Sequence, residues 1–287
     1  ARGDRRAARL HLFQQARHHA VSERIGLLAG NGRLPFLFSQ AAKAQGLEVH
    51  VVALEGEADA ALSSQVATMQ WVKVGQADGI VAAFKKQGVS KAVMAGGVGR
   101  IRSLTQARPD VGMLKIAAGL RALRDDELLR GVAKYFESKG VQIVAPTDYV
   151  KSVLAQRGHL AGPELTDVQR RDVELGREVA AALGAVDVGQ TVVVKEGVVL
   201  AVEAVEGTDA CVRRAGQFGG PGGVVVKRCK PTQDLRFDLP AAGPVTLEVM
   251  REAGATVLAV EAGKTVLLDA ELLFTDAAKL GFSVVGY

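Results

Sequence analysis

The chain has 287 residues, of which 48% are hydrophobic and 5% aromatic, so it is long enough for two domains and apolar enough to bury a sizeable core. Its formal net charge is +5, but the first twenty residues hold five arginines against a single aspartate, and the remainder is close to neutral. That distribution disfavours nucleic acid as a partner of the main body. Two cysteines, with no His/Cys pairs at ligand spacing, exclude a disulfide framework and disfavour a zinc site.

Residues 1–23 are predicted to form a basic N-terminal extension. The stretch lacks the apolar core and the cleavage site of a secretory signal, and no segment of the chain has the uninterrupted apolar residues that a membrane span needs. We therefore expect a cytoplasmic protein. The extension is interpreted as a frayed end or as a surface helix on anionic lipid.

Residues 24–148 are predicted to form a domain of alternating strands and helices. The run "RIGLLAGNGRLPFLFSQAAKAQGLEVHVVAL" indicates a strand, a glycine turn, a helix with Pro35 in its first turn and Gly46 at its end, and a second buried strand. "ADGIVAAFKKQGV" with "KAVMAGGVGR", and "RDDELLRGVAKYFESKGVQIVAP" with Asp125 and Asp126 as caps, repeat the helix–strand pattern. This alternation predicts an α/β fold with an open parallel sheet covered on both faces.

Residues 149–165 show no clear strand pattern and are predicted to be a linker. Residues 166–287 are predicted to form a separate α/β or α+β domain that starts with a capped helix and continues with a hairpin turning at Glu196-Gly197. Further strands are expected in "GGVVVKRCK", "ATVLAVEAG" and "TVLLD", and helices in "TLEVMREAG" and "LLFTDAAKLG".

Two glycine turns of the first domain are candidate phosphate sites. Each follows a predicted strand, and unpaired N–H groups at the start of a helix attract anions. The third glycine of the dinucleotide fingerprint is replaced by Pro35, which disfavours a nicotinamide enzyme. The alternative is a turn that needs glycine only for its backbone angles. The candidate residues are Gly30, Asn31 and Gly32 in one turn and Gly96 and Gly97 in the other, with Arg100 and Arg102 next in the chain.

Two segments of the second domain gather charge. In "VEAVEGTDACVRRAG", Glu203, Glu206 and Asp209 follow an apolar strand, where acids can share a divalent cation or cap the next helix. The segment "KRCKPTQDLRFDLP", from Lys227 to Pro240, holds two lysines, two arginines and two aspartates, and its two prolines stiffen it. Preorganised charge of both signs suits phosphoryl chemistry, although an ordinary solvated loop is also charged.

Five segments together resemble the LpxI-type UDP-2,3-diacylglucosamine pyrophosphatases of lipid A synthesis. They are "GLLAGNGRLP", "AGGVGR", "RDDELLRGV", "DVGQTVVVKEGVVLAVEAVEGTD" and "KPTQDLRFDLPAAGPVT", and the similarity runs in order from about Ile25 to Gly286. The resemblance implies a Rossmann-like N-terminal domain, a family-specific C-terminal domain and a substrate bound between them. It also implies hydrolysis of UDP-2,3-diacylglucosamine to UMP and 2,3-diacylglucosamine 1-phosphate (lipid X), with Mg²⁺ or another divalent cation such as Mn²⁺, on the cytoplasmic face of the inner membrane of Gram-negative bacteria.

The resemblance also implies roles for individual residues. Asp238 of the "DLP" element is the expected key aspartate, holding the metal or aligning the attacking water, with Asp209 as its companion and Glu206 as a further metal ligand. Peripheral contact with the membrane is expected, and a homodimer is allowed. The expected substrate-binding residues of the second domain are Thr208, Lys227, Lys230, Gln233 and Arg236.

Two other functions remain open from the residues alone. An oxidoreductase or group-transfer enzyme would use the first glycine turn and bind a dinucleotide. A nucleotide- or lipid-sensing module would bind its ligand through the charged segment without metal-dependent turnover.

Overall fold

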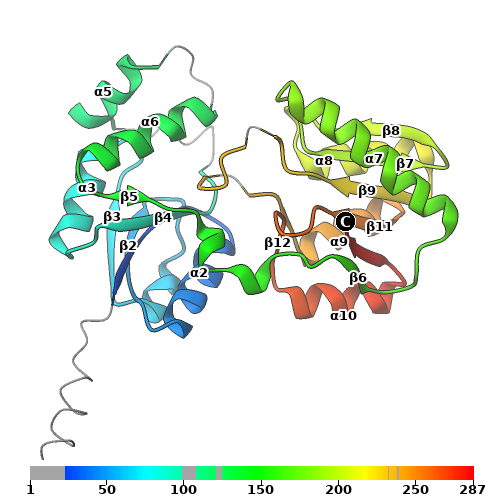
Figure 1. The fold of residues 1–287 in the computed structure, drawn as a ribbon, viewed down its shortest axis with the longest axis horizontal. Helices are drawn as coiled ribbons and strands as arrows, with labels where there is room; N and C mark the ends of the chain where they lie inside the picture. The colour runs from blue at the N-terminus through cyan, green and yellow to red at the C-terminus, as the bar shows by residue number, and fades with distance from the viewer. Residues whose placement is uncertain (1–22, 99–107, 121–124, 232, 238) are drawn as a thin grey trace, which may run out of the picture. The chain divides into compact units, whose positions relative to one another are not determined.

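The computed structural model describes residues 23–98, 108–120, 125–231, 233–237 and 239–287. The predictions for residues 1–22, for Arg100 and Arg102 and for Asp238 therefore lie outside the described residues, as do those for the side chains of Asp125 and Asp126. The chain divides into two compact units, the first ending at Val144 and the second beginning at Ala145. Each unit has a main β-sheet of its own (Figure 1).

The first unit is built on a parallel sheet in the order β3-β2-β1-β4-β5. This order matches five of the six strands of the doubly wound arrangement and confirms the predicted Rossmann-like α/β domain. In β2, six of the seven residues are buried, which is why its sequence is a continuous apolar run rather than an alternating one. The strands are β1 (Arg24–Ala29), β2 (Glu48–Leu54), β3 (Thr68–Val72), β4 (Lys91–Ala95) and β5 (Gln142–Ile143).

Helices connect the strands of the first unit. Pro35 lies in the first turn of α2, and Gly46, just after its end, has a φ of 79°, a value that favours glycine. The element β3 and the short helix α5 were not expected from the sequence pattern. The helices are α2 (Leu34–Ala44), η2 (Ala60–Gln65), α3 (Ala77–Lys86), α5 (Val111–Ala118) and α6 (Asp125–Ser138).

The second unit contains a mixed sheet in the order β6-β13-β11-β9-β7-β8. Strands β9, β11 and β13 run parallel, β7 is antiparallel to both β8 and β9, and β6 is antiparallel to β13. A separate two-stranded ladder joins β10 and β12. The strands are β6 (Gly158–Ala161), β7 (Thr191–Lys195), β8 (Val198–Val202), β9 (Gly223–Lys227), β10 (Ala241–Ala242), β11 (Ala255–Val260), β12 (Val266–Leu267) and β13 (Ser283–Gly286).

Helices cover both faces of this sheet. Val224 and Val226 of β9 belong to the core on the α7 face, whereas Val225 points to the opposite core, against α8, α9 and α10. This alternation is the period of two expected of a strand. The helices are η3 (Pro146–Asp148), η4 (Lys151–Val153), α7 (Asp167–Ala185), α8 (Thr208–Gly219), α9 (Pro244–Ala253) and α10 (Ala270–Leu280). The predicted separate α/β domain is confirmed.

The segment predicted to lack a strand contains β6. Its residues pair with β13 near the chain's C-terminus, with His159 opposite Val285, and Ala155 and Leu165 are buried in the cores of the second unit. The prediction that this segment has no strand is therefore wrong. The pairing partner of β6 lies more than 120 residues further along the chain, so no local sequence pattern indicates the strand.

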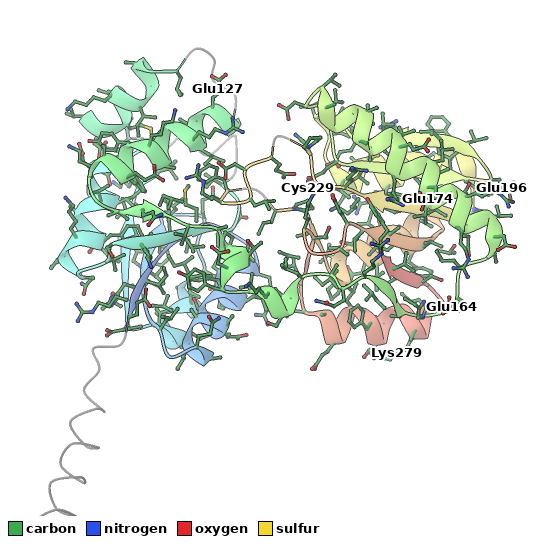
Figure 2. The ribbon with its side chains drawn as sticks, viewed as in Figure 1. Glu127, Glu164, Glu174, Glu196, Cys229 and Lys279 are labelled. Atoms are coloured by element: carbon green, nitrogen blue, oxygen red, sulfur yellow. The ribbon has the colours of Figure 1, made fainter. Side chains whose placement is uncertain are left out.

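The predicted cap of α7 and the predicted hairpin turn are both present in the structure. Thr166 caps α7, accepting from the N–H of Gln169, while Gln169 accepts from the N–H of Thr166. Glu196 lies at the tip of the β7–β8 hairpin (Figure 2), with Gly197 beside it. Among the described helices, none combines the length and the apolar character of a membrane span.

Candidate active site

The two glycine turns of the first unit meet at its topological switch point. The chain leaves β1 for β2 on one side, and β4 lies on the other, so ligands are expected where the turns after β1 and β4 lie. Asn31 and Gly97 form an antiparallel bridge between these turns. The structure therefore brings all five predicted glycine-turn residues to one edge of the sheet.

Close packing explains three of the glycines. A Cβ on Gly30 would fall on the carbonyl oxygen of Gly97, and a Cβ on Gly96 on that of Asn31. A Cβ on Gly97 would lie 2.7 Å from the side-chain oxygen of Asn31. The glycine requirement at these positions follows from two backbones that cross, so it does not by itself indicate a ligand.

Gly32 and the side chain of Asn31 differ from the packed glycines. Gly32 has a φ of 88°, and open space surrounds the position of a Cβ. The side-chain amide of Asn31 donates to the Glu57 carboxylate at 2.8 Å. Glu57, which follows β2, is thus the acid that reaches the glycine turn, and the sequence pattern alone did not single it out.

The carboxyl edge of the second sheet gathers polar residues from several strands. Lys227 ends β9, and in register with it Thr191 begins the antiparallel β7. Glu203 follows β8, and Thr208 opens α8. Because parallel strands end at the same edge, residues that are far apart in the sequence converge here.

These four residues form a hydrogen-bonded cluster that is mostly buried. The Thr208 hydroxyl donates to Glu203 Oε1 at 3.1 Å and lies 3.1 Å from the Thr191 hydroxyl. The Lys227 ammonium donates to Thr208 Oγ1 at 3.3 Å and to the Ala241 carbonyl at 2.8 Å. Lys227 is 5% exposed and Glu203 7%, so these charges are held by partners rather than by water.

The charged segment between β9 and β10, residues 228–240, is held largely by its own side chains. Arg236 forms a two-pronged pair with Asp234, with Nε at 3.0 Å from Oδ1 and Nη2 at 2.8 Å from Oδ2. Gln233 Oε1 accepts the N–H of Lys230 at 3.0 Å and the thiol of Cys229 at 3.1 Å. The charged and polar side chains of this segment therefore bond to one another and to its backbone, which shapes the segment.

Three further contacts tie the same segment to the body of the second unit. The N–H of Cys229 donates to Glu261 Oε2 at 3.0 Å, and the Lys230 ammonium lies 2.7 Å from Asp187 Oδ1. The N–H of Arg228 donates to the Gln190 carbonyl at 2.8 Å. Lys230 and Arg236 are partly exposed, so of the predicted phosphate-binding cations they are better placed than Lys227 to meet a ligand.

Of the three predicted metal ligands, Glu206 and Asp209 lie within the described residues and Asp238 does not. Glu206 pairs with Arg214 at 2.5 Å, and the hydrogen bonds from its own backbone and then from Arg214 hold its pKa below the ordinary value. Asp209 is exposed in the first turn of α8. Outside residues 1–22, 99–107, 121–124, 232 and 238, no group of three His, Cys, Asp or Glu residues has the arrangement of a metal site. The described carboxylates alone therefore do not form an all-protein cage for a magnesium ion.

Comparisons with known proteins cover almost the whole chain. The model of the LpxI N-terminal domain matches residues 24–153, and that of the LpxI C-terminal domain matches residues 156–285. A relative from Caulobacter vibrioides, the UDP-2,3-diacylglucosamine pyrophosphatase LpxI, is 33% identical over 274 residues, which are 92% of this chain and 97% of the relative.

Similarity to solved structures is much weaker. The Bordetella bronchiseptica enzyme WbmG, in complex with NAD and UDP, is 19% identical with a TM-score of 0.28, over 42% of this chain and 36% of that one. A biotin carboxylase domain of a thermophilic 2-oxoglutarate carboxylase, bound to ADP, is 16% identical with a TM-score of 0.26, over 69% of this chain and 34% of that one. The chain thus spans about a third of the length of either protein, and neither likeness bears on function.

Proposed function

The chain belongs to the LpxI family, and on that basis we propose that it hydrolyses the pyrophosphate bond of UDP-2,3-diacylglucosamine to UMP and 2,3-diacylglucosamine 1-phosphate. The observation that carries the proposal is the match along both domains to a relative of that name, which the chain covers over 97% of its length. Family membership of both units matters because a fold alone hosts many chemistries.

In this proposal the second unit supplies the reacting end of the site. Lys230 and Arg236 meet the diphosphate and exchange their present partners, Asp187 and Asp234, for phosphate oxygens, while Gln233 keeps the turn that places them. Asp238, assisted by Asp209, aligns the attacking water and accepts its proton. Asp238 lies outside the described residues, so its role rests on the family resemblance.

The first unit would bind the nucleotide at its switch point. The rim formed by Gly30 to Gly32 and by Gly96 and Gly97 presents backbone groups to phosphate, and Asn31 and Glu57 add an amide and a carboxylate for the sugar or base. The buried Lys227 and Thr208 support the site from beneath rather than contact the substrate.

Dependence on Mg²⁺ is proposed from the resemblance alone. When bound, a divalent cation would neutralise charge on the diphosphate. The described carboxylates form no cluster of three, so in this proposal one or two carboxylates would hold the cation together with phosphate oxygens of the substrate. Chelation by EDTA should abolish UMP release and added Mg²⁺ should restore it, whereas activity that survives EDTA would remove the metal from the proposal.

Peripheral contact with the cytoplasmic face of the inner membrane and a homodimeric state also remain proposals. Both follow from the kind of substrate and from the family resemblance. Flotation with anionic vesicles and light scattering of the purified chain test them separately: protein left at the bottom of the gradient contradicts the first, and a monomeric mass contradicts the second.

The decisive test is release of UMP from UDP-2,3-diacylglucosamine by the purified chain and by Asp238→Ala. We expect turnover by the unchanged chain and a loss of at least about a hundredfold in the variant, as for removal of a general base. Asp276→Ala, on the surface of α10, is the matched control and should keep its activity. The proposal is overturned by an unchanged chain that leaves the substrate intact.

A further inference from the structure

The segment between β9 and β10 is closed at its base by a side chain. Lys227 is the last residue of β9, and its ammonium donates to the carbonyl of Ala241, the first residue of β10, at 2.8 Å. The two residues that flank the segment 228–240 are thereby fastened to each other. A loop whose ends are tied has fewer conformations to explore than one anchored only through its strands.

The tie depends on a lysine that is almost fully buried. Lys227 is 5% exposed, and burial of an ammonium is unfavourable unless its charge and its hydrogen bonds are matched. Thr208 Oγ1 accepts one of its bonds at 3.3 Å, and the carboxylate of Glu203, itself 7% exposed, stands on the other side of that hydroxyl. The buried positive charge therefore has a buried negative charge one hydroxyl away.

Counting donors shows why Glu203 orients this arrangement. A threonine hydroxyl has one proton and two lone pairs. The Thr208 proton goes to Glu203 Oε1, an acceptor-only group when ionised, which turns the lone pairs toward the Lys227 ammonium and the Thr191 hydroxyl. If the carboxylate of Glu203 is removed, the Thr208 proton loses its preferred acceptor. The hydroxyl can then rotate, which weakens the bond that it accepts from Lys227.

Glu203 also supports the other entry to the loop. Its Oε2 accepts the N–H of Gln190 at 3.4 Å, and the carbonyl of Gln190 accepts the N–H of Arg228, the first residue of the loop, at 2.8 Å. One carboxylate thus contacts the residues that hold both ends of the segment, through Gln190 at Arg228 and through Thr208 and Lys227 at Ala241.

We propose that Glu203 is a positioning residue that acts through Thr208 and Lys227 to fix the β9–β10 loop in its working place. The catalytic consequence rests on the proposed function, since Lys230 and Arg236 of that loop are the cations assigned to the diphosphate. The structural consequence does not: the loop should loosen when the chain of contacts is cut, with or without substrate.

Hydrogen exchange of the ligand-free protein measures the structural consequence. The reporters are loop amides with defined acceptors, those of Arg228, Cys229, Gln233 and Phe237. In Thr208→Val and Lys227→Met we expect these amides to exchange about tenfold faster, which corresponds to a loss of about 1.4 kcal/mol in the free energy of opening the loop. Glu203→Gln, which removes the charge and keeps the shape of the side chain, should also speed the exchange. Thr208→Ser keeps the hydroxyl and should exchange like the unchanged chain.

Steady-state UMP release measures the catalytic consequence. The variants that loosen the loop should lower kcat by about tenfold to a hundredfold with KM changed much less, because groups on a displaced loop are misplaced in the transition state, and Thr208→Ser should recover the rate. A loss of activity with unchanged amide exchange would overturn the proposal, since Thr208 and Lys227 would then contact the substrate themselves.

The two measurements also separate this proposal from the proposed function. If the unchanged chain releases no UMP while Thr208→Val still frees the loop amides, the enzyme assignment fails and the anchoring of the loop by Glu203 stands. If Lys227→Met does not fold, Glu203→Gln and the Thr208 pair carry the test alone. Exchange in Glu203→Gln and Thr208→Val that matches the unchanged chain refutes the anchoring.

Discussion

Asn31 and Gly97 exchange both of their backbone hydrogen bonds: the N–H of Asn31 lies 2.8 Å from the Gly97 oxygen, and the N–H of Gly97 lies 3.1 Å from the Asn31 oxygen. The turns after β1 and β4 are therefore one structure, and the N–H of Gly30 adds a third bond to Ala95 O at 2.9 Å. Neither turn can shift without the other, which gives the switch-point edge of the first unit a defined shape.

Gly30→Ala should destabilise the first unit. The added methyl group would overlap the carbonyl oxygen of Gly97, and this backbone atom cannot move aside by a change of side-chain rotamer. Overpacking of this kind typically costs about 1–3 kcal/mol. Thermal unfolding followed by circular dichroism measures the effect. Gly119→Ala is the control, because its Cβ has no neighbour closer than 3.5 Å. Equal midpoints for the two variants would contradict the crossing-backbone explanation.

Asp172→Ala should loosen the β7–β8 hairpin. Asp172 on α7 is 2% exposed, and its carboxylate accepts the N–H of Glu196 at 2.8 Å and that of Gly197 at 2.7 Å. Removing the acceptor leaves two backbone donors unmatched, and we expect a loss of about 1–3 kcal/mol in urea unfolding. Glu178→Ala, exposed on the same helix, should cost much less, and a comparable loss in that variant would refute the assignment.

The regular parts of the fold could be predicted because their signals are local. The continuous apolar run of β2, the proline and glycine at the ends of α2 and the Glu196-Gly197 turn are all read within a few residues. Strand β6 could not be predicted in this way, since it exists only through β13. The two-residue strand β10 likewise depends on its partner β12.

Some residues of the candidate site could likewise be predicted from local sequence, and others could not. Glycine turns after strands are visible in the sequence, so their meeting at one edge was predictable once the sheet was taken as parallel. The three acids of "VEAVEGTD" look alike in sequence, yet Glu203 is buried beneath Thr208 and Glu206 is exposed and paired with Arg214. Which acid turns inward depends on the sheet edge, a property of the assembled fold.

Helices α3 and α5 cap each other through two aspartates. Asp110 accepts the N–H of Met113 in its own helix at 2.9 Å and that of Asp78 in α3 at 2.7 Å. Asp78 in turn accepts the N–H of Gly112 at 2.9 Å and the hydroxyl of Tyr135 at 2.5 Å. Each carboxylate satisfies the start of the other helix, which ties α3, α5 and α6 together.

This arrangement predicts a pH dependence of stability. The bond from Tyr135 and that from Gly112 hold the pKa of Asp78 below its ordinary value, and the pKa of Tyr135 is raised to about 12 by its bond to Asp78. Because the pKa of Asp78 is lower in the folded state, its stabilising contribution is present above the unfolded-state pKa of about 4 and is lost as the pH falls through the folded-state value.

The midpoint of thermal unfolding should therefore fall more steeply below about pH 5 in the unchanged chain than in Asp78→Asn, and the two curves should converge in acid. Tyr135→Phe removes the principal cause of the shift and should flatten the dependence toward that of Asp78→Asn. Asp276→Asn is the control for a surface carboxylate. Parallel curves for the unchanged chain and Asp78→Asn would show that the ionised carboxylate contributes nothing.

Arg214 protects the open edge of the second sheet. β8 is the last strand in its sheet and carries the apolar sequence Val-Val-Leu-Ala-Val, which is a template for pairing with another chain. The Arg214 guanidinium donates to the carbonyl of Val202 at 2.8 Å, at the end of that strand, and Glu206 holds the guanidinium in place. A charged group bonded to an edge carbonyl blocks that group from a neighbouring strand.

Arg214→Ala should therefore increase self-association. We expect light scattering to report a mass above that of the unchanged chain at the same concentration, and the excess should grow with concentration because the new contact is between chains. Arg213→Ala is the matched control, because Arg213 donates to Glu252 on α9, whereas Arg214 donates to the end of β8. If Arg213→Ala associates as readily as Arg214→Ala, loss of surface charge rather than exposure of the strand edge is the cause, and the protective role of Arg214 is refuted.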